Sequence, residues 1–240
     1  MAERVIVGWS GGKDSALALH EILRDDRYTV AGLLTTVTAG YDRISMHGVR
    51  RSLLRRQAQA LDLPLWEAVI PVKASNQEYE AEMWNVLAAV RSQVPDVSAC
   101  VFGDLFLEEI RSYRERMLGR VGMRGLFPLW RRDTTVLARE FVRLGYKAVV
   151  VCVDTTALHQ RFAGMEFDEE LLRSLPAGVD PCGENGEMHT FVYDGPIFAR
   201  PIAHKKGQIV LREERFAYCD LIEKAGEATG MPSERRLGDG

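Results

Sequence analysis

Residues 5–19 read VIVGWSGGKDSALAL, and this stretch decides how the chain begins to fold. A short apolar run is followed by two glycines and then by apolar residues at helical spacing. This order predicts a buried strand, a tight turn and a helix that lies on a sheet. Such a turn directs free backbone N–H groups and the positive end of the helix dipole at an anion. The stretch therefore predicts a phosphate-binding loop at the start of an α/β fold.

The sequence of the loop matches neither of two common nucleotide-binding motifs. A Walker loop has glycine five positions before its Gly-Lys pair and Ser or Thr after the lysine, where this chain has Val7 and Asp14. The dinucleotide fingerprint also fails, because it needs three spaced glycines and the turn holds only two. The predicted loop consists of Ser10, Gly11, Gly12, Lys13, Asp14 and Ser15.

Each residue type in this loop suits a nucleotide's phosphates. Gly11 and Gly12 let the backbone approach an anion closely, and Ser10 and Ser15 add hydroxyl donors. A carboxylate beside phosphates is best explained if Mg²⁺ accompanies them, so Asp14 is a candidate metal ligand. ATP with Mg²⁺ is the expected ligand.

Strand and helix patterns alternate through the first half of the chain. Further strands are predicted over residues 29–37, 63–70 and 99–104, and helices over 49–61, 79–90 and 107–122. This alternation predicts a Rossmann-like, mostly parallel sheet with helices on both faces. We place this nucleotide-binding domain at residues 1–130.

The pattern changes after residue 130. A helix over 134–144 and an apolar strand over 146–154 precede a turn-rich segment over 178–200, and the later strand candidates lie within 191–194 and 207–218. We predict a smaller α+β domain over residues 131–225, which would bind the second substrate. The polar, Gly-rich residues 226–240 are expected to be a disordered tail.

Composition excludes several classes of protein. With 31 basic and 34 acidic residues among 240, the net charge of −3 makes a nucleic-acid partner unlikely and gives no sign of membrane-surface binding. No signal pattern or apolar run of bilayer length is present, so a cytoplasmic protein is expected. The four cysteines form no CxxC pair and are expected to be buried thiols. Oligomeric state is left open, with a homo-oligomer possible.

The string SGGKDS resembles the pyrophosphate loop of the N-type ATP pyrophosphatases. The resemblance implies cleavage of ATP between the α and β phosphates, transfer of AMP to a substrate oxygen and pyrophosphate held in the loop. Three more segments occur in matching order: SMHGVRRSLLRRQAQALDLPL (45–65), VFGDLFLEEIRSYRERMLGRVGMRGLFPLW (101–130) and PCGENGEMHTFVYDGPIF (181–198). With the loop, they resemble the diphthine-ammonia ligase family.

That resemblance implies an amide-forming ligase. In the family, ATP activates a carboxylate on a modified histidine of translation elongation factor 2, and ammonia displaces AMP. The same pair of domains occurs in bacteria, which make no diphthamide, so a small carboxylate metabolite is the alternative acceptor. Lys13 and Asp14 are the expected catalytic residues of the loop.

The segment 181–198 is expected to carry the second half of the chemistry. Its glycines shape a loop that bears Glu184 and Glu187, with His189 directly after. Two carboxylates and an imidazole could bind ammonium and take its proton, or hold a cationic substrate. The alternative is that Glu184 satisfies N–H groups of the turn and that His189 is an ordinary strand residue.

Other site residues follow from position. Gly103 and Asp104 end a predicted strand at the ligand-binding edge of the sheet, so Asp104 is a candidate for Mg²⁺ or pyrophosphate contact, or else a helix cap. The family resemblance places Thr35 beside the adenine or ribose and His47 at the base pocket, although His47 could instead cap or pack a helix. It also favours Arg111, which could equally pair with glutamates on its helix.

Two other functions remain open at this stage. A tRNA-modifying sulfur transferase would share the loop, but such enzymes commonly use paired cysteines and a basic RNA surface, and this chain shows neither. Cys182, within the segment 181–198, is the one residue that keeps this function open. A nucleotide-binding sensor without chemistry would also keep the loop. The four arginines of residues 50–56 are interpreted first as a solvated helix face.

Overall fold

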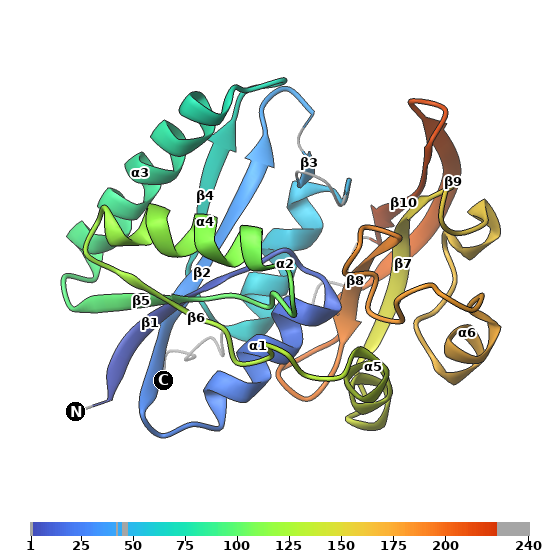
Figure 1. Cartoon of the computed structure of the whole chain (residues 1–240), viewed down its shortest axis with the longest axis horizontal. Coiled ribbons are helices and arrows are strands. Elements are labelled where there is room, and N and C mark those ends of the chain that lie inside the picture. The colour runs from blue at the N-terminus through green and yellow to red at the C-terminus, as the bar shows by residue number, and fades with distance from the viewer. Residues whose placement is uncertain (1, 42, 45–47, 225–240) are drawn as a thin grey trace, which may run out of the picture.

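The computed structural model describes residues 2–41, 43–44 and 48–224, which form two neighbouring sheets with their helices (Figure 1). The first sheet and its helices comprise, in chain order, β1 (Glu3–Gly8), α1 (Lys13–Leu23), β2 (Tyr28–Thr38), β3 (Arg43–Ile44), α2 (Arg51–Leu61), β4 (Leu65–Ile70), α3 (Asn76–Gln93), β5 (Val97–Val101), α4 (Glu108–Gly119) and β6 (Arg124–Leu126). The remainder comprises α5 (Thr134–Arg143), β7 (Lys147–Asp154), the 3-10 helix η1 (Gln160–Phe162), α6 (Glu169–Ser174), β8 (Met188–Asp194), β9 (His204–Arg212) and β10 (Phe216–Glu223).

The first sheet is parallel except for its shortest strand. β1 pairs in parallel with β2 and β5, while β4 and β6 extend the two sides. β4 pairs with one edge of β2 as far as Thr38. On the other edge of β2, β1 pairs as far as Leu34, and the antiparallel β3 pairs with the residues beyond it. Connections leave β1 and β5 in opposite directions, and such a switch point is where open α/β sheets bind ligands.

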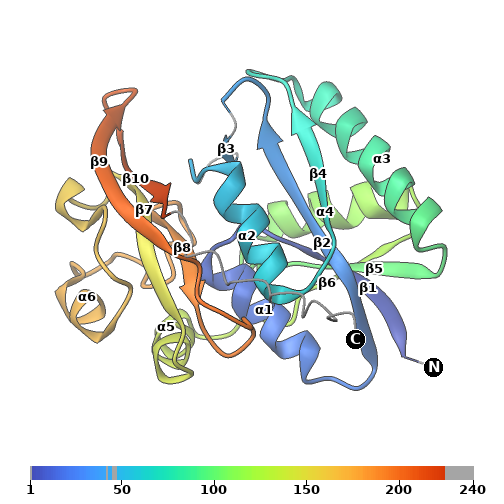
Figure 2. The ribbon, with the colours of Figure 1, turned by 180° about the vertical axis from the view of Figure 1, so that it is seen from behind.

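Helices cover both faces of this sheet (Figures 1 and 2). Alternate residues of β1 point to opposite faces, so Val5 and Val7 pack with α1 and α2, whereas Ile6 packs with α3 and α4. Ser75 and Glu78 form a capping box that fixes the start of α3. The predicted α/β fold class is therefore confirmed.

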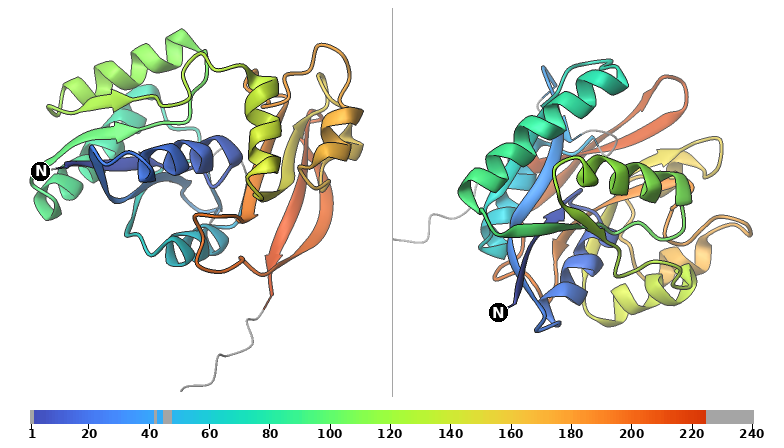
Figure 3. Two further views of the ribbon diagram at one scale, coloured as in Figure 1. Left: turned by 90° about the horizontal axis from the view of Figure 1, so that it is seen from below. Right: turned by 60° about the vertical axis from the view of Figure 1, so that its left-hand side comes forward.

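The second sheet is antiparallel, with strand order β8-β7-β10-β9. Its apolar strand β7 is buried from Ala148 onward, and its core is continuous with the α1–α2 face of the first sheet. Figure 3 shows the second sheet standing beside α1, with α6 on the side away from α1. The side chain of Asp133 caps the start of α5, because it accepts a hydrogen bond from the Val136 N–H at 2.9 Å.

The structure departs from the sequence-based expectations in several places. β3 and β6 add strands to the first sheet, and the short helices η1 and α6 were not predicted. The stretch 207–218 is not one strand but parts of β9 and β10, separated by a turn in which Glu213 and Glu214 have positive φ. The arginines of α2 are not simply solvated, since Arg51 and Arg55 both pair with Glu67. The predicted tail, residues 226–240, lies outside the described residues.

Candidate active site

A cavity of about 350 Å³ lies at the carboxyl ends of β1, β2 and β5 and is closed on its far side by the loop before β8. Ten of the predicted site residues line it: Ser10, Gly12, Lys13, Asp14, Ser15, Thr35, Gly103, Asp104, Glu184 and His189. Both sheets therefore contribute side chains to one pocket.

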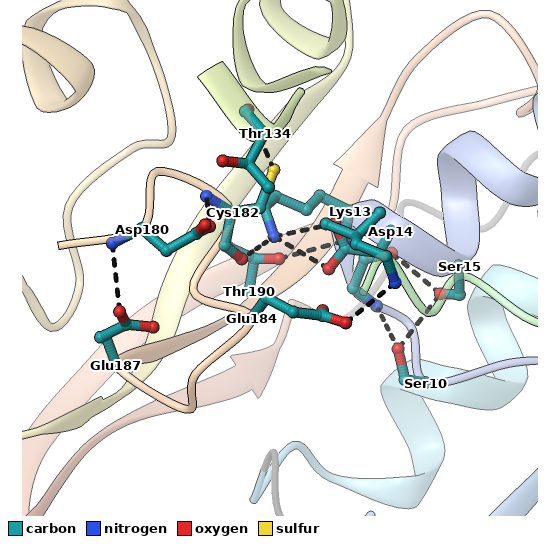
Figure 4. Close-up of polar contacts among 12 residues, drawn as sticks. Ser10, Lys13, Asp14, Ser15, Thr134, Asp180, Cys182, Glu184, Glu187 and Thr190 are labelled. Carbon is teal, nitrogen blue, oxygen red and sulfur yellow. Dashed lines mark hydrogen bonds and ion pairs between the residues drawn. The ribbon is translucent and has the colours of Figure 1, made fainter. Parts of the chain in front are cut away.

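The glycine loop has the geometry of an anion cradle. Gly11 has a φ of +78°, in the left-handed region that favours glycine. The hydroxyl oxygens of Ser10 and Ser15 lie 3.2 Å apart, and Ser10 accepts a hydrogen bond from the Gly12 N–H at 3.3 Å. Helix α1 starts at Lys13, so its first N–H groups and the two hydroxyls face the same space (Figure 4).

A buried glutamine holds this loop from behind. Gln57 of α2 is fully buried, and its amide donates to the carbonyl oxygens of Gly11 at 3.0 Å and Val192 at 2.6 Å. Its own oxygen accepts from the indole N–H of Trp9 at 3.0 Å. A Cβ at Gly11 would lie 2.6 Å from that oxygen, so glycine is required there. Gln57 thus ties the loop to β8, and the sequence reasoning missed it.

Replacement of Gln57 by Leu should destabilise the protein and raise the KM for ATP. Leucine fills a similar volume but removes the side-chain donor from the carbonyls of Gly11 and Val192 and the acceptor from the Trp9 N–H. The Gly11 carbonyl keeps the Val192 N–H, and each group left unsatisfied costs about 1–3 kcal/mol. Thermal unfolding and ATP-dependent turnover would measure both effects. Gln59→Leu, at an exposed position of the same helix, is the matched control and should change neither. Unchanged KM in the Gln57 variant would contradict this positioning role.

Strand β8 completes the loop from the second sheet. The Lys13 N–H donates to Oγ1 of Thr190 at 3.0 Å, and the Val192 N–H donates to the carbonyl oxygen of Gly11 at 2.9 Å. Because these bonds use the first turn of α1, the loop is not formed by the first sheet alone. The candidate site therefore needs both parts of the chain.

Lys13 is the buried cation of the pocket, with 2% of the residue exposed. Its ammonium donates to both carboxylate oxygens of Asp14, at 2.8 and 3.0 Å, and to the carbonyl oxygen of Cys182. Burial by itself would lower the pKa of Lys13, but the negative charges of Asp14 and Glu184 outweigh it and raise the pKa. Lys13 is therefore charged, and it joins the loop to the segment that bears Glu184.

Gly103 brings β5 against the start of α1. A Cβ at this position would lie 2.6 Å from the carbonyl carbon and oxygen of Asp14, which only glycine avoids. The next residue, Asp104, pairs with the guanidinium of Arg114, whose Nε lies 2.7 Å from Oδ2. Arg114 also stacks over the ring of Phe102, 4.3 Å from its centroid. The pocket lining thus holds a second cation in addition to Lys13.

Glu184 points into the pocket and is the carboxylate best suited to proton transfer. One of its oxygens accepts the Leu105 N–H at 2.9 Å (Figure 4). Burial, with the nearby charges of Asp14 and Asp104, raises the pKa of Glu184 to about 7, although the Leu105 N–H and Lys13 oppose the rise. A carboxyl group with that pKa exchanges a proton readily near neutral pH.

His189 lies on the same wall of the pocket. Burial, reinforced by the positive charge of Lys13, lowers the pKa of His189 to about 4, so its imidazole is neutral at pH 7. It sits on β8 opposite Cys152 in the sheet register. Its place beside the pocket is compatible with either a strand residue or a ligand contact, the two alternatives that the sequence left open.

The structure does not bring Glu187 to the pocket. Its carboxylate turns away and accepts N–H bonds from Asp180 and Asn185, both at 3.1 Å, and the side-chain amide of Asn185 at 3.1 Å (Figure 4). Glu187 is 5% exposed and lines no part of the cavity. The catalytic role predicted for it is therefore not supported, and its carboxylate instead holds the shape of the loop that presents Glu184.

Arg111 is likewise absent from the pocket wall. It stacks on Phe127 and Trp130 and donates to Glu115 at 2.9 Å, so its position favours the helix-surface alternative. Arg114, one turn further along α4, lines the pocket where Arg111 was expected. His47 lies outside the described residues, so the prediction for it stays a prediction. The lining residues that the sequence did not single out include Tyr79, Met83, Phe102 and Arg114.

The donor set fits a magnesium ion that arrives with phosphates. Across residues 2–41, 43–44 and 48–224, no group of three or more His, Cys, Asp or Glu side chains could hold a metal alone. Mg²⁺ is commonly bound by one or two carboxylates together with substrate phosphates, which requires no such cage. Asp14 and Asp104 supply two carboxylates at the same pocket. They are the residues that would hold the ion.

The fold and the loop define a class of protein: an α/β nucleotide-binding protein with a pyrophosphate-type loop, completed by a second sheet. Two family models match the chain, the diphthamide synthase N-terminal domain over residues 3–125 and the diphthamide synthase C-terminal domain over residues 133–227. The chain belongs to the diphthamide synthase family, as the motifs predicted.

Curated relatives carry one name. The diphthine–ammonia ligase of Schizosaccharomyces pombe is 26% identical over 217 residues, which cover 84% of this chain but 36% of the yeast protein. Those of Danio rerio and Homo sapiens are 26% and 25% identical, covering 88% and 87% of this chain and 90% and 85% of their own lengths. The chain thus spans about a third of the yeast relative and most of the vertebrate ones.

No helix within residues 2–41, 43–44 and 48–224 is both long enough and apolar enough to cross a bilayer.

Proposed function

We propose that this protein is an ATP-dependent ligase that adenylylates a carboxylate, releases pyrophosphate and then transfers ammonia or an amine to the activated acyl group. One observation carries the proposal: the pyrophosphate-type loop and the segment bearing Glu184 face each other across one pocket, joined by the hydrogen bond from Lys13 to the carbonyl of Cys182. Activation and transfer can therefore occur at one place.

In the first step, the carboxylate oxygen of the acceptor attacks the α-phosphorus of ATP, and the bond to the bridging oxygen breaks. Negative charge then grows on the departing pyrophosphate. The N–H groups of α1 that follow Lys13, the hydroxyls of Ser10 and Ser15, and the ammonium of Lys13 are placed to receive that charge, whereas the Lys13 N–H itself donates to Thr190. Bound Mg²⁺ would neutralise further phosphate charge between Asp14 and Asp104.

In the second step, the nitrogen of ammonia attacks the acyl carbon and AMP leaves with the activating oxygen. The attacking nitrogen must lose a proton. Glu184 has a pKa of about 7 and lies in the same pocket, so its carboxylate can take that proton and return it to water. Ammonia is mostly ammonium in solution, and the carboxylates around the pocket favour its entry as that cation. The nitrogen then loses one proton before the attack and a second after it, and both can pass through Glu184 to water.

The names of the relatives indicate the acceptor. They are diphthine–ammonia ligases, so diphthine is the proposed carboxylate substrate and ammonia the proposed donor. A small carboxylate metabolite is the alternative if the organism makes no diphthamide. The names and the pocket both support amide formation, which is common to the two acceptors.

The sulfur-transfer alternative is disfavoured by the state of Cys182. Its thiol is 2% exposed and donates to the carbonyl oxygen of Thr134 at 3.3 Å. Burial raises the pKa of Cys182 to about 12, although Lys13 opposes the rise. A thiol at that pKa forms almost no thiolate at neutral pH and is a poor nucleophile.

Turnover should release AMP and pyrophosphate in equal amounts. Purified protein would be given Mg-ATP, an ammonium salt and elongation factor 2 that carries diphthine, and the nucleotide products would be separated by chromatography. Omission of the acceptor is the control and should suppress release of AMP. Formation of ADP and phosphate would contradict the proposed bond cleavage, and acceptor-independent hydrolysis would contradict the ligase.

A further inference from the structure

A second, larger cavity of about 690 Å³ lies between the two sheets, beside the nucleotide pocket. Its walls are the β9–β10 hairpin on one side and, on the other, β3, the end of β2 and the turn before α3. Figure 1 shows this hairpin projecting past β3 at one end of the molecule. None of the roles described above uses this cavity.

The two cavities adjoin. Ile44 of β3 lines both of them. Along β2, Thr35 and Thr36 line the nucleotide pocket, and Thr38 lines the second cavity. The two cavities therefore share a wall at Ile44, and β2 runs along both of them.

Ion pairs hold the walls of this cavity together. Asp220 of β10 pairs with Arg43 at 3.0 Å and with Arg50 at 2.7 Å, and these bonds lower the pKa of Asp220. The backbone of Gly48 packs on the ring of Tyr218, where a Cβ would lie 2.7 Å from a ring carbon. The hairpin thus has a fixed place relative to β3, and the space between them is a built feature of the fold.

The lining combines free cations with exposed apolar side chains. Among the described residues, neither Lys73 nor Arg212 forms an ion pair, whereas the acidic Asp220 is neutralised by its two arginines. The lining holds three cations, Arg43, Lys73 and Arg212, against the carboxylates of Glu213 and Asp220, which leaves one net positive charge. Three large apolar residues at the mouth are unusually exposed: Tyr41 by 57%, Val72 by 46% and Val210 by 42%.

We propose that this cavity and the exposed face of the hairpin are the docking site for a protein acceptor, which presents its carboxylate through the cavity to the nucleotide pocket. The site rests on the proposed ligase function and adds where the acceptor binds and to what class it belongs. Lys73 and Arg212 would attract the carboxylate-bearing segment, and the apolar mouth would cover neighbouring protein surface.

Size and exposure favour a protein over a small metabolite. The cavity is larger than the nucleotide pocket, at about 690 Å³ against about 350 Å³. The edge strand β9 exposes apolar side chains on both of its faces: Val210 lines the cavity, and Ile209 and Leu211, 52% and 50% exposed, lie on the opposite face because neighbouring residues of a strand alternate. Exposed apolar surface rimmed by charge is typical of protein interaction sites. A small carboxylate would leave most of this surface uncovered.

Two variants test the docking site by direct binding. Val210→Asp places a charge in the apolar mouth, and Arg212→Glu reverses a cation, so each should weaken binding of diphthine-bearing elongation factor 2 by about tenfold or more. Binding would be measured by thermophoresis with the full chain, and ATP affinity should stay unchanged. Val136→Asp and Arg139→Glu, at exposed positions of α5, are the matched controls and should bind like the wild type.

The outcomes separate the docking site from the ligase function. Wild-type affinity in both hairpin variants would overturn the docking site, as would absence of binding by the wild-type chain. A short diphthine-containing peptide that binds as tightly as the whole factor would also overturn it, because the mouth would then contribute nothing. Binding that is weakened as expected, with no turnover by the wild type, would support the docking site and refute the proposed ligase function alone.

Discussion

Replacement of Lys13 by Met should reduce kcat/KM for ATP by about 10²–10³, the loss typical when one preorganised donor to a developing negative charge is removed. Lys13 is the buried cation at the start of α1, and its ammonium contacts the Asp14 carboxylate and the Cys182 carbonyl together. Methionine keeps the apolar stem but supplies no charge for the departing pyrophosphate. Initial rates of AMP release across ATP concentrations would measure the loss.

The same substitution also removes the partner of a carboxylate. Asp14 would be left without its cation, and an uncompensated charge beside the loop repels phosphates. Lys147→Met is the matched control, because Lys147 pairs with Asp194 at 3.1 Å on an exposed edge. Exposed pairs contribute about 0–1 kcal/mol, so this control should melt and turn over like the wild type. Full activity in Lys13→Met would remove the loop from the proposed chemistry.

The first strand, loop and helix were predictable because their signals are local. An apolar run, two glycines and a helical pattern lie within residues 5–19, and the structure has β1 and α1 there. β6 and α6 could not be found in this way, since they have only three and six residues and too few positions to show a period. The β9–β10 turn was hidden because its central residues are glutamates rather than glycines.

The sequence indicates which segments carry the candidate site better than it indicates which residue of each segment faces the pocket. Spacing places Glu184 and Glu187 on one loop, but only the backbone path decides which carboxylate enters the pocket and which bonds to the loop's own N–H groups. Arg111 and Arg114 differ by one helical turn, and aromatic rings far along the chain hold the first of them.

Gln57 is different, because the sequence did contain its signal. It lies on the apolar side of α2, at helical spacing from Leu53, Leu54 and Leu61, where a buried amide needs partners. A polar residue on such a face indicates a hydrogen-bonded role inside the protein. The partners themselves, Gly11 and Val192, required the fold.

Replacement of Glu184 by Gln should lower the rate of amide formation by about 10²–10⁴ while sparing adenylylation, which is the usual effect of losing a general base. Glutamine keeps an oxygen that can accept the Leu105 N–H, so the loop should retain its shape. Because burial raises the pKa of Glu184 to about 7, the wild-type rate should rise with pH to a bend near pH 7. The variant should lack this bend and follow only the titration of ammonium.

Stability should report the same group independently of catalysis. A carboxyl with a raised pKa binds its proton more tightly in the folded protein, so it lowers the free energy of unfolding as pH rises from 4.5 towards 7. The lowered pKa of His189 has the opposite effect: below pH 6.5 it makes the free energy of unfolding rise with pH. His189 is present in both proteins, so this contribution cancels in the difference between them. Relative to the wild type, Glu184→Gln should therefore gain stability between pH 4.5 and pH 7.

Three measurements together decide the role of Glu184: the rate profile, the pH dependence of denaturant unfolding, and trapping of the adenylate by rapid quench. Glu109→Gln is the matched control, since Glu109 is exposed in the first turn of α4 and outside the pocket wall. A bend near pH 7 that persists in Glu184→Gln would assign the titration to another group. Loss of the adenylate in that variant would place Glu184 in activation rather than in transfer. Both proposed steps are assigned to the same pocket, so a general base for ammonia and a ligand of ATP are distinguished by which step the variant blocks.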